Sequence, residues 1–153
     1  MVAIQGKKGF SLVELVIVMA VIALIMSIAI PNFRSMQQEG SLTKAEGDLD
    51  TLKIAISSYW RGNAQAYPAN IHTALTGATP SVITKVLTDP WVTDATNVTY
   101  GYTKGTDATF GDYFFLYTKG PKADTAPAWD ATNQRVNYTG TGRVVSNAPV
   151  LKN

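Results

Sequence analysis

The chain has 153 residues, which is enough for one domain and too few for two comfortable ones. It contains no cysteine, which excludes a disulfide framework, a thiolate nucleophile and a cysteine-based metal site. The formal charge of +2 comes without a basic or acidic block, so it gives no electrostatic argument for nucleic-acid binding.

An apolar run dominates the N-terminal part of the sequence. Residues 15–30 carry no charge, and Ser27 is the only clearly polar side chain among them. A core helix of a soluble protein should show a polar stripe, and this run shows none. Residues 10–30 form a stretch of 21, and a helix of that length spans ~30 Å of hydrocarbon. The length therefore favours a retained membrane helix.

A removable secretory signal is the alternative interpretation of this run. Lys7 and Lys8 form a positive leader, and residues 27–29 (Ser-Ile-Ala) resemble a cleavage site that would release a secreted domain after Ala29. Against it, the run exceeds the ~7–15 apolar residues of such signals. If the helix is retained, the two lysines stay on the cytoplasmic side and place the rest of the chain outside.

Two residues in and beside the run do not fit a plain membrane helix. Glu14 is a carboxylate in an apolar segment, which is costly unless it has a positive partner or reaches the headgroups and water. Pro31 removes one backbone hydrogen bond, so we expect it to kink, end or loosen the helix.

A second helical pattern follows over residues 32–60. Its apolar residues recur at spacings of three and four with charged residues between them, which predicts an amphipathic helix with one buried stripe. The two patterns together predict one long helix over residues 10–60, with Gly62 and Asn63 as stop signals. The stripe consists of Leu42, Ala45, Leu49, Leu52, Ile56 and Tyr59.

The remaining residues read as loops and short strands. We expect loops over residues 63–97 with one helical turn near residues 71–75, then strands at 98–103 and 112–118 joined by a loop at 105–111. A third strand falls at 135–138 or 143–145. The predicted fold is α+β: a long N-terminal helix, half apolar and half amphipathic, packed on a small antiparallel sheet.

No pattern in the sequence indicates an enzyme. There is no P-loop, GxSxG or HExxH motif, and the single histidine, His72, has no cluster around it, so we interpret it as a loop or surface residue. Trp60, Trp91 and Trp129 are expected to pack in the globular part or at a subunit contact; a carbohydrate platform is the other interpretation.

Residues 9–14, Gly9-Phe10-Ser11-Leu12-Val13-Glu14, follow a short basic leader and precede the apolar run. This stretch resembles the processing motif of type IV pilins and type II secretion pseudopilins. Pro31 is the twenty-second residue from Phe10, where that family commonly has a proline. The resemblance covers about the first fifth of the chain.

The resemblance implies that a prepilin peptidase cuts between Gly9 and Phe10 and that the new Phe10 amine is methylated. It also implies that Glu14 pairs with the Phe10 amine of a neighbouring subunit and so checks the register of assembly. Phe10, Glu14 and Pro31 are thus the candidate assembly residues. The expected parts are a leader (1–9), a transmembrane and filament-core helix (10–31) and a globular head (32–153). Loss of two lysines leaves 11 basic and 11 acidic residues.

Motifs in the middle of the chain extend the resemblance to the head of major type II secretion pseudopilins. They are YP at residues 67–68, LTDPW at 87–91, YGY at 100–102 and DYFFLYTKG at 112–120. In that family the following loop binds calcium through aspartates. Here Lys122 stands where an aspartate is expected, which leaves Asp124 and Asp130 as weak calcium candidates and no other cofactor.

The resulting hypothesis is a non-enzymatic subunit of a helical filament assembled from the inner membrane. The major pseudopilin of a type II secretion system is favoured, and the major pilin of an extracellular type IV pilus is the alternative. The implied partners are further copies, the prepilin peptidase, the assembly machinery, minor pilins or pseudopilins and the membrane, but no nucleic acid. The N-terminus is expected in the cytoplasm and the head in the periplasm, before incorporation into a periplasmic or extracellular filament.

Overall fold

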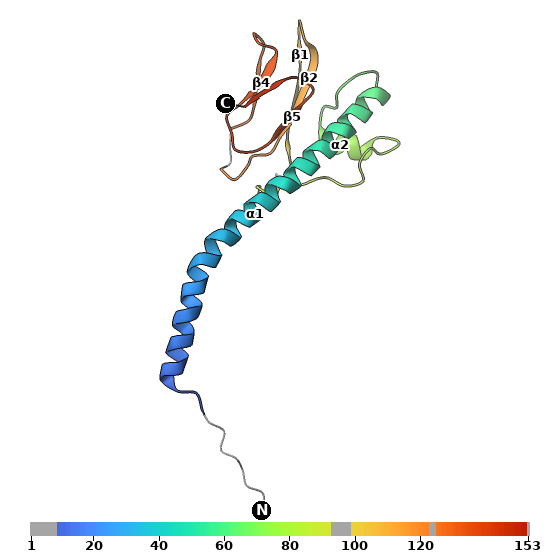
Figure 1. The fold of residues 1–153 in the computed structure, drawn as a ribbon. Coiled ribbons are helices and arrows are strands. Elements are labelled where there is room, and N and C mark those ends of the chain that lie inside the picture. Colours follow the sequence, from blue (N-terminus) through green and yellow to red (C-terminus); the bar gives the residue numbers. More distant parts are fainter. Residues whose placement is uncertain (1–8, 93–98, 123–124, 153) are drawn as a thin grey trace, which may run out of the picture. The chain divides into compact units, whose positions relative to one another are not determined.

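The computed structural model describes residues 9–92, 99–122 and 125–152. In this part of the chain, two helices are followed by six short strands (Figure 1). The residues divide into two compact units, Met1–Gln37 and Gln38–Asn153, and the first helix contributes to both. The elements are α1 (Leu12–Gly62), α2 (Ile71–Gly77), β1 (Gly101–Asp107), β2 (Gly111–Tyr117), β3 (Ala128–Asp130), β4 (Arg135–Tyr138), β5 (Val144–Ser146) and β6 (Val150–Lys152).

The predicted α+β class and the single long helix are confirmed. α1 runs without interruption through Pro31, so of the three expected effects this proline does not end the helix, while a kink or a loosening there stays a prediction. A proline removes only one helical hydrogen bond, here the one to the carbonyl of Ser27, and the helix continues on both sides of it. α1 ends where the side-chain amide of Asn63 donates to the carbonyl of Tyr59 at 2.9 Å, beside two residues with positive φ, Ala64 and Gln65.

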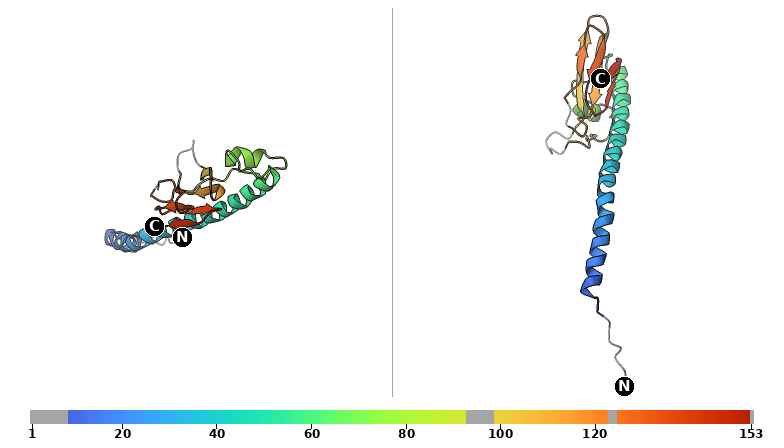
Figure 2. Two further views of the ribbon diagram at one scale, coloured as in Figure 1. Left: turned by 90° about the horizontal axis from the view of Figure 1, so that it is seen from above. Right: turned by 60° about the vertical axis from the view of Figure 1, so that its left-hand side comes forward.

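The buried stripe of α1 lies where the spacing predicts it. Its four central residues are fully buried, whereas the end residues Leu42 and Tyr59 are half-buried. Ala55 is also buried, although the pattern did not single it out. Within the second unit, α1 runs alongside the strands (Figure 2). The central residues are Ala45, Leu49, Leu52 and Ile56.

The first sheet packs one of its faces on α1. It has the order β1-β2-β5, and all its neighbouring strands are antiparallel. Along β2, Phe114 and Leu116 belong to the core cluster that includes the α1 stripe and two residues of α2, Ile71 and Leu75. Phe115 between them is equally buried but lies outside that cluster. Because side chains alternate along a strand, Phe115 faces the other side of the sheet.

A second small sheet differs from the prediction of one antiparallel sheet. Its order is β3-β4-β6, with β3 antiparallel and β6 parallel to β4. It contributes two buried residues, Val136 and Tyr138. Trp129 of β3 stacks on Tyr113 of β2 with ring centroids 4.0 Å apart, which ties the two sheets together. Both positions proposed for a third strand form strands, β4 and β5.

The predicted loop over residues 105–111 is too long. β1 continues to Asp107, and its register places Gly105 opposite Tyr113 and Gly101 opposite Tyr117. A Cβ at either glycine would collide with the tyrosine ring across from it. These glycines therefore mark a close cross-strand approach instead of a turn. β1 begins at Gly101, three residues later than the predicted strand, whose first residue lies outside the described ranges.

The predicted helical turn near residues 71–75 is confirmed as α2. Asn70 caps it, because its side-chain oxygen accepts hydrogen bonds from the backbone N–H groups of His72 and Thr73. His72 is therefore in a helix and half-buried, which corrects its interpretation as a loop residue. Burial lowers the pKa of its imidazole.

Candidate functional site

The predicted cleavage site lies just before α1. Gly9, Phe10 and Ser11 have no helical structure, and the Phe10 side chain is 80% exposed. The first helical turn closes when Leu15 N–H donates to the carbonyl of Ser11 at 3.2 Å. A peptidase could therefore reach the bond between Gly9 and Phe10 without unwinding the helix. The geometry suits the predicted processing, which stays a prediction.

Glu14 occupies the first turn of α1, and its side chain is exposed. Negative charge is favourable at this end of a helix, because unpaired backbone N–H groups and the helix dipole are positive there. The ion pairs within the described residues are Lys44–Asp48, Arg135–Asp130 and Arg143–Glu46, and Glu14 takes part in none of them. Its carboxylate is thus available for a partner outside the described part of its own chain.

Residues 15–37, which follow Glu14, bury none of their apolar side chains. An 18-residue window of α1 is apolar enough to cross a membrane, and no residue in that window is buried. A signal sequence near the N-terminus would have the same composition. From Leu15 to Phe33 the large apolar side chains are about half to two-thirds exposed. Such a surface is far larger than a soluble monomer leaves uncovered.

The described residues do not assemble the predicted calcium site. Asp124 lies outside them. Asp130 accepts hydrogen bonds from Thr132, Asn133 and Asn137 and pairs with Arg135. These contacts, led by the Asn133 side chain, lower the pKa of its carboxyl group. Asp130 thus caps the β3–β4 turn, and the described residues hold no group of three His, Cys, Asp or Glu side chains that could bind a metal.

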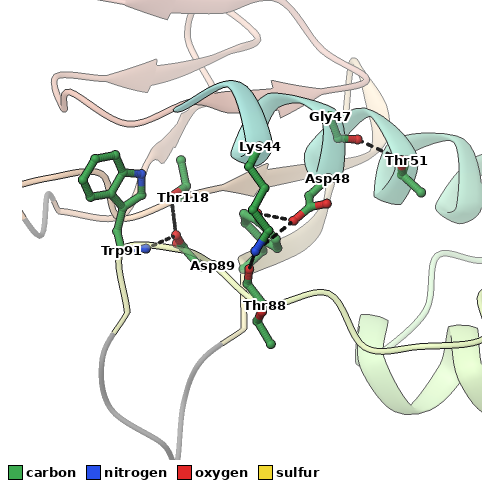
Figure 3. A network of polar contacts seen from close by, with 9 residues as sticks. Lys44, Gly47, Asp48, Thr51, Thr88, Asp89, Trp91 and Thr118 are labelled. Atoms are coloured by element: carbon green, nitrogen blue, oxygen red, sulfur yellow. Dashed lines mark hydrogen bonds and ion pairs between the residues drawn. The ribbon is translucent and has the colours of Figure 1, made fainter. Parts of the chain in front are cut away.

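A buried carboxylate that the sequence did not single out lies within the LTDPW motif. Asp89 is only 3% exposed. It accepts hydrogen bonds from the backbone N–H groups of Trp91 and Lys119 at 3.0 Å each, and both its oxygens lie within 2.8 Å of the Thr118 hydroxyl (Figure 3). An aspartate before proline reads as an ordinary turn signal, so only its burial reveals that it joins two distant loops.

A neighbouring polar network joins α1 to Tyr100, the residue before β1, and to the segment that contains Thr88. Asp48 accepts a 2.7 Å hydrogen bond from the Tyr100 hydroxyl and lies 4.0 Å from the Lys44 ammonium group. Lys44 also donates to the carbonyl of Thr88 (Figure 3). The pKa of Tyr100 is raised mainly by burial and, as the second cause, by its hydrogen bond to Asp48. These contacts fix the second unit internally.

The three tryptophans were expected to pack the head or a subunit contact. Trp129 stacks on Tyr113 and donates from its indole nitrogen to Asp107 at 3.2 Å. Trp60 stacks more loosely on Tyr67. Trp91 is half-buried beside the Asp89 network. Intramolecular packing therefore accounts for Trp129 and Trp60.

Comparison with known proteins points to the same N-terminal segment. Residues 4–30 match the family model of the prokaryotic N-terminal methylation motif. Over 54 residues the chain is 37% identical to a fimbrial protein of Pseudomonas aeruginosa, 40% to the type IV major pilin protein PilA of Myxococcus xanthus and 33% to the type IV major alpha-pilin of Moraxella bovis.

The similarity is confined to part of each protein. The matched residues are 35% of this chain and 35%, 24% and 34% of those three relatives. The chain thus spans about a third or less of the curated relatives it matches. No solved structure matches it.

Proposed function

We propose, from the premise that the N-terminal segment of this chain is of the type IV pilin family, that the protein is a structural subunit of a helical filament assembled from the inner membrane. One observation carries the proposal. The N-terminal half of α1 exposes an uninterrupted apolar surface that contains a single carboxylate, and the helix begins at Leu12, within the matched methylation motif.

The proposed mechanism replaces lipid by protein around this surface. In the bilayer, hydrocarbon covers the apolar half of α1. In a filament, the same half packs against copies of itself. Pairing of Glu14 with the Phe10 amine of a neighbour would remove the cost of a buried charge only at the correct axial stagger. The subunit acts by assembling, so the proposed role is not enzymatic.

Processing at Gly9 and Phe10 is part of the proposal, with a prepilin peptidase, the assembly machinery and minor subunits as partners. Before assembly, α1 crosses the inner membrane once, with the N-terminus in the cytoplasm and residues 32–153 in the periplasm. The positive leader supports this orientation.

Two filament types remain candidates. The head motifs at residues 67–68, 87–91, 100–102 and 112–120 favour the major pseudopilin of a type II secretion system. The names of the relatives favour the pilin of an extracellular pilus, although that match covers only 35% of this chain. Deletion of the gene separates the two: loss of protein export supports the first, whereas loss of surface fibres with export intact supports the second.

An intact-mass measurement on the protein from membranes tests the processing. The expected mass is that of residues 10–153 with one methyl group on the Phe10 amine. A secreted binding domain, the third possibility, would begin at Ile30. That mass, or an uncleaved chain in filament-forming cells, would overturn the assignment.

A further inference from the structure

The face of α1 opposite its buried stripe has a regular pattern of its own. Its residues recur at spacings of three, four, three and four, as the buried residues do, but they are offset by two positions. Two positions on an α-helix correspond to about 200°, so this set lies on the opposite face. All of its members are exposed and belong to the second unit. This outer stripe consists of Gly40, Thr43, Gly47, Asp50 and Ile54.

The contacts within the chain do not explain the composition of the outer stripe. A Cβ at Gly40 or Gly47 would meet no atom within 4 Å, yet each glycine destabilises a helix interior by ~1 kcal/mol relative to alanine. Ile54 is 69% exposed, and the next most exposed large apolar side chain among those described in the second unit is Val150 at 40%. A close approach by another surface would account for both features.

Some of the described carboxylates have no ion pair or hydrogen bond within the described residues, and one of these lies on the outer stripe. Six carboxylates in the described residues form an ion pair or a hydrogen bond: Glu46, Asp48, Asp89, Asp107, Asp112 and Asp130. For the other three described carboxylates no such contact is present within those residues, and all three lie on α1: Glu14, Glu39 and Asp50. Asp50 is a member of the outer stripe, so the stripe presents a negative charge next to an apolar side chain.

A complementary surface exists elsewhere on the same chain. Lys119 and Lys122 lie on the turn after β2, and Lys122 is exposed and takes part in none of the ion pairs within the described residues. The base of this turn is fixed, because Asp89 binds the hydroxyl of Thr118 and the backbone N–H of Lys119, and Gly120 adopts a φ of 68°. A turn fixed in this way loses little conformational entropy when it binds.

We propose that the outer stripe of α1 docks on a second copy of this chain, with Asp50 facing Lys122 of that copy and Ile54 and Gly47 in closest contact. The chain itself supplies both charges, which argues for a copy as the occupant. The inference rests on the proposed filament function. In a filament the contact is head-to-tail, with Asp50 of each copy facing Lys122 of the next, and repetition of such a heterologous contact without closure produces a helical array.

The outer stripe is too small to bind a free protein stably, so its occupant should be a copy that is already held nearby. One exposed isoleucine and one ion pair are far less than the ~1,200–2,000 Å² buried by a stable interface between free proteins. Copies joined through their apolar helices would have a high effective concentration, and a weak contact then suffices. The contact sets how neighbouring subunits are placed without holding them together alone.

Disulfide trapping tests the contact directly, because the full-length chain has no cysteine of its own. In assembled filaments, Asp50→Cys combined with Lys122→Cys should give a ladder of covalent multimers on oxidation. Each single-cysteine variant should stay monomeric. The matched control, Asp50→Cys with Lys85→Cys, should also stay monomeric, because Lys85 is an exposed lysine outside the proposed contact. Cysteines cross-link only when their Cα atoms come within ~7 Å. Filaments that contain both cysteines and give no ladder would overturn the contact.

Charge reversal provides a second test in the full-length protein. Asp50→Lys and Lys122→Glu should each lower filament yield several-fold, and the double variant should restore it. Lys85→Glu is the matched control and should not rescue Asp50→Lys. Normal yield from both single variants would overturn the docking and leave the filament function intact. A wild-type chain that matures but forms no filament would overturn both.

Discussion

The two halves of α1 are parts of one helix with opposite relations to their surroundings. Residues 12–37 expose nearly every large apolar side chain, whereas residues 38–62 bury one stripe and expose the rest. One continuous pattern of helical hydrogen bonds thus carries two halves whose side chains have different surroundings. The difference shows that hydrophobicity alone does not define a core: the second half packs against its own chain, whereas the apolar side chains of the first half are not covered by any of the described residues.

The division predicts that changes in the first half alter processing and assembly, whereas changes in the second half alter stability. Gly9→Val should have the largest effect, because a side chain next to the cleaved bond blocks the peptidase. An uncleaved, unassembled precursor should accumulate in membranes, as measured by immunoblot and intact mass. Normal maturation would show that the assigned cleavage site is wrong.

Leu49→Ala probes the buried stripe. Residues 32–153 produced alone should be soluble and fold, and this change should lower their free energy of unfolding by ~2–5 kcal/mol, because Leu49 is completely buried. Ile54→Ala on the outer face of the same helix is the matched control and should cost under ~0.5 kcal/mol. Urea denaturation measures both. Equal effects would erase the distinction between the two faces.

Asp89→Ala probes the buried network of the second unit. Each donor left without an acceptor costs ~1–3 kcal/mol, and the change orphans the hydroxyl of Thr118 and the N–H groups of Trp91 and Lys119. Asp112→Ala, at an exposed aspartate, should have little effect. If the two variants unfold at the same denaturant concentration, Asp89 does not hold the loops together.

His72 should contribute a small pH dependence to the second unit. Burial lowers the pKa of its imidazole below the unfolded value of 6.5, so the unfolded state binds a proton more readily. Stability is therefore complete above pH 6.5 and decreases as pH falls toward the folded pKa. Asp107 and Asp130 have pKa values below 3.8, mainly because hydrogen bonds stabilise their carboxylates, and so they act at lower pH.

The change in melting temperature of residues 32–153 between pH 7 and pH 5 measures this effect. His72→Gln should make the change smaller, since glutamine does not titrate. If wild type and variant respond equally to pH, the half-buried imidazole makes no contribution in this window.

The sequence predicted the features that depend on local periodicity. The length of α1, the stripe centred on Leu49 and the turn that became α2 all follow from spacings of three and four. β3 and β6 were missed, because three residues such as Ala128–Asp130 carry no alternation, and distant partners hold them in place. Gly105 was assigned to a loop, because the tyrosine ring that covers it comes from another strand.

The residues of the candidate site also fall into those that a local pattern predicts and those that only the fold brings together. The methylation motif is contiguous in sequence and was recognised there. Asp89 was missed, because its partners Thr118 and Lys119 lie about thirty positions away and only the fold brings them together. The roles of Gly9, Phe10, Glu14 and Pro31 in processing and assembly remain predictions, since they concern contacts with other molecules.

Filament yield from Glu14→Gln tests the central claim most directly. Glutamine keeps the size and hydrogen bonding of the side chain but removes its charge, so membrane insertion and the fold of residues 38–153 should be unchanged. The account predicts that methylated, processed subunit accumulates in the membrane while sheared filaments disappear. Wild-type filament yield from this variant would contradict it and would leave Glu14 as a headgroup-level residue without a role in assembly.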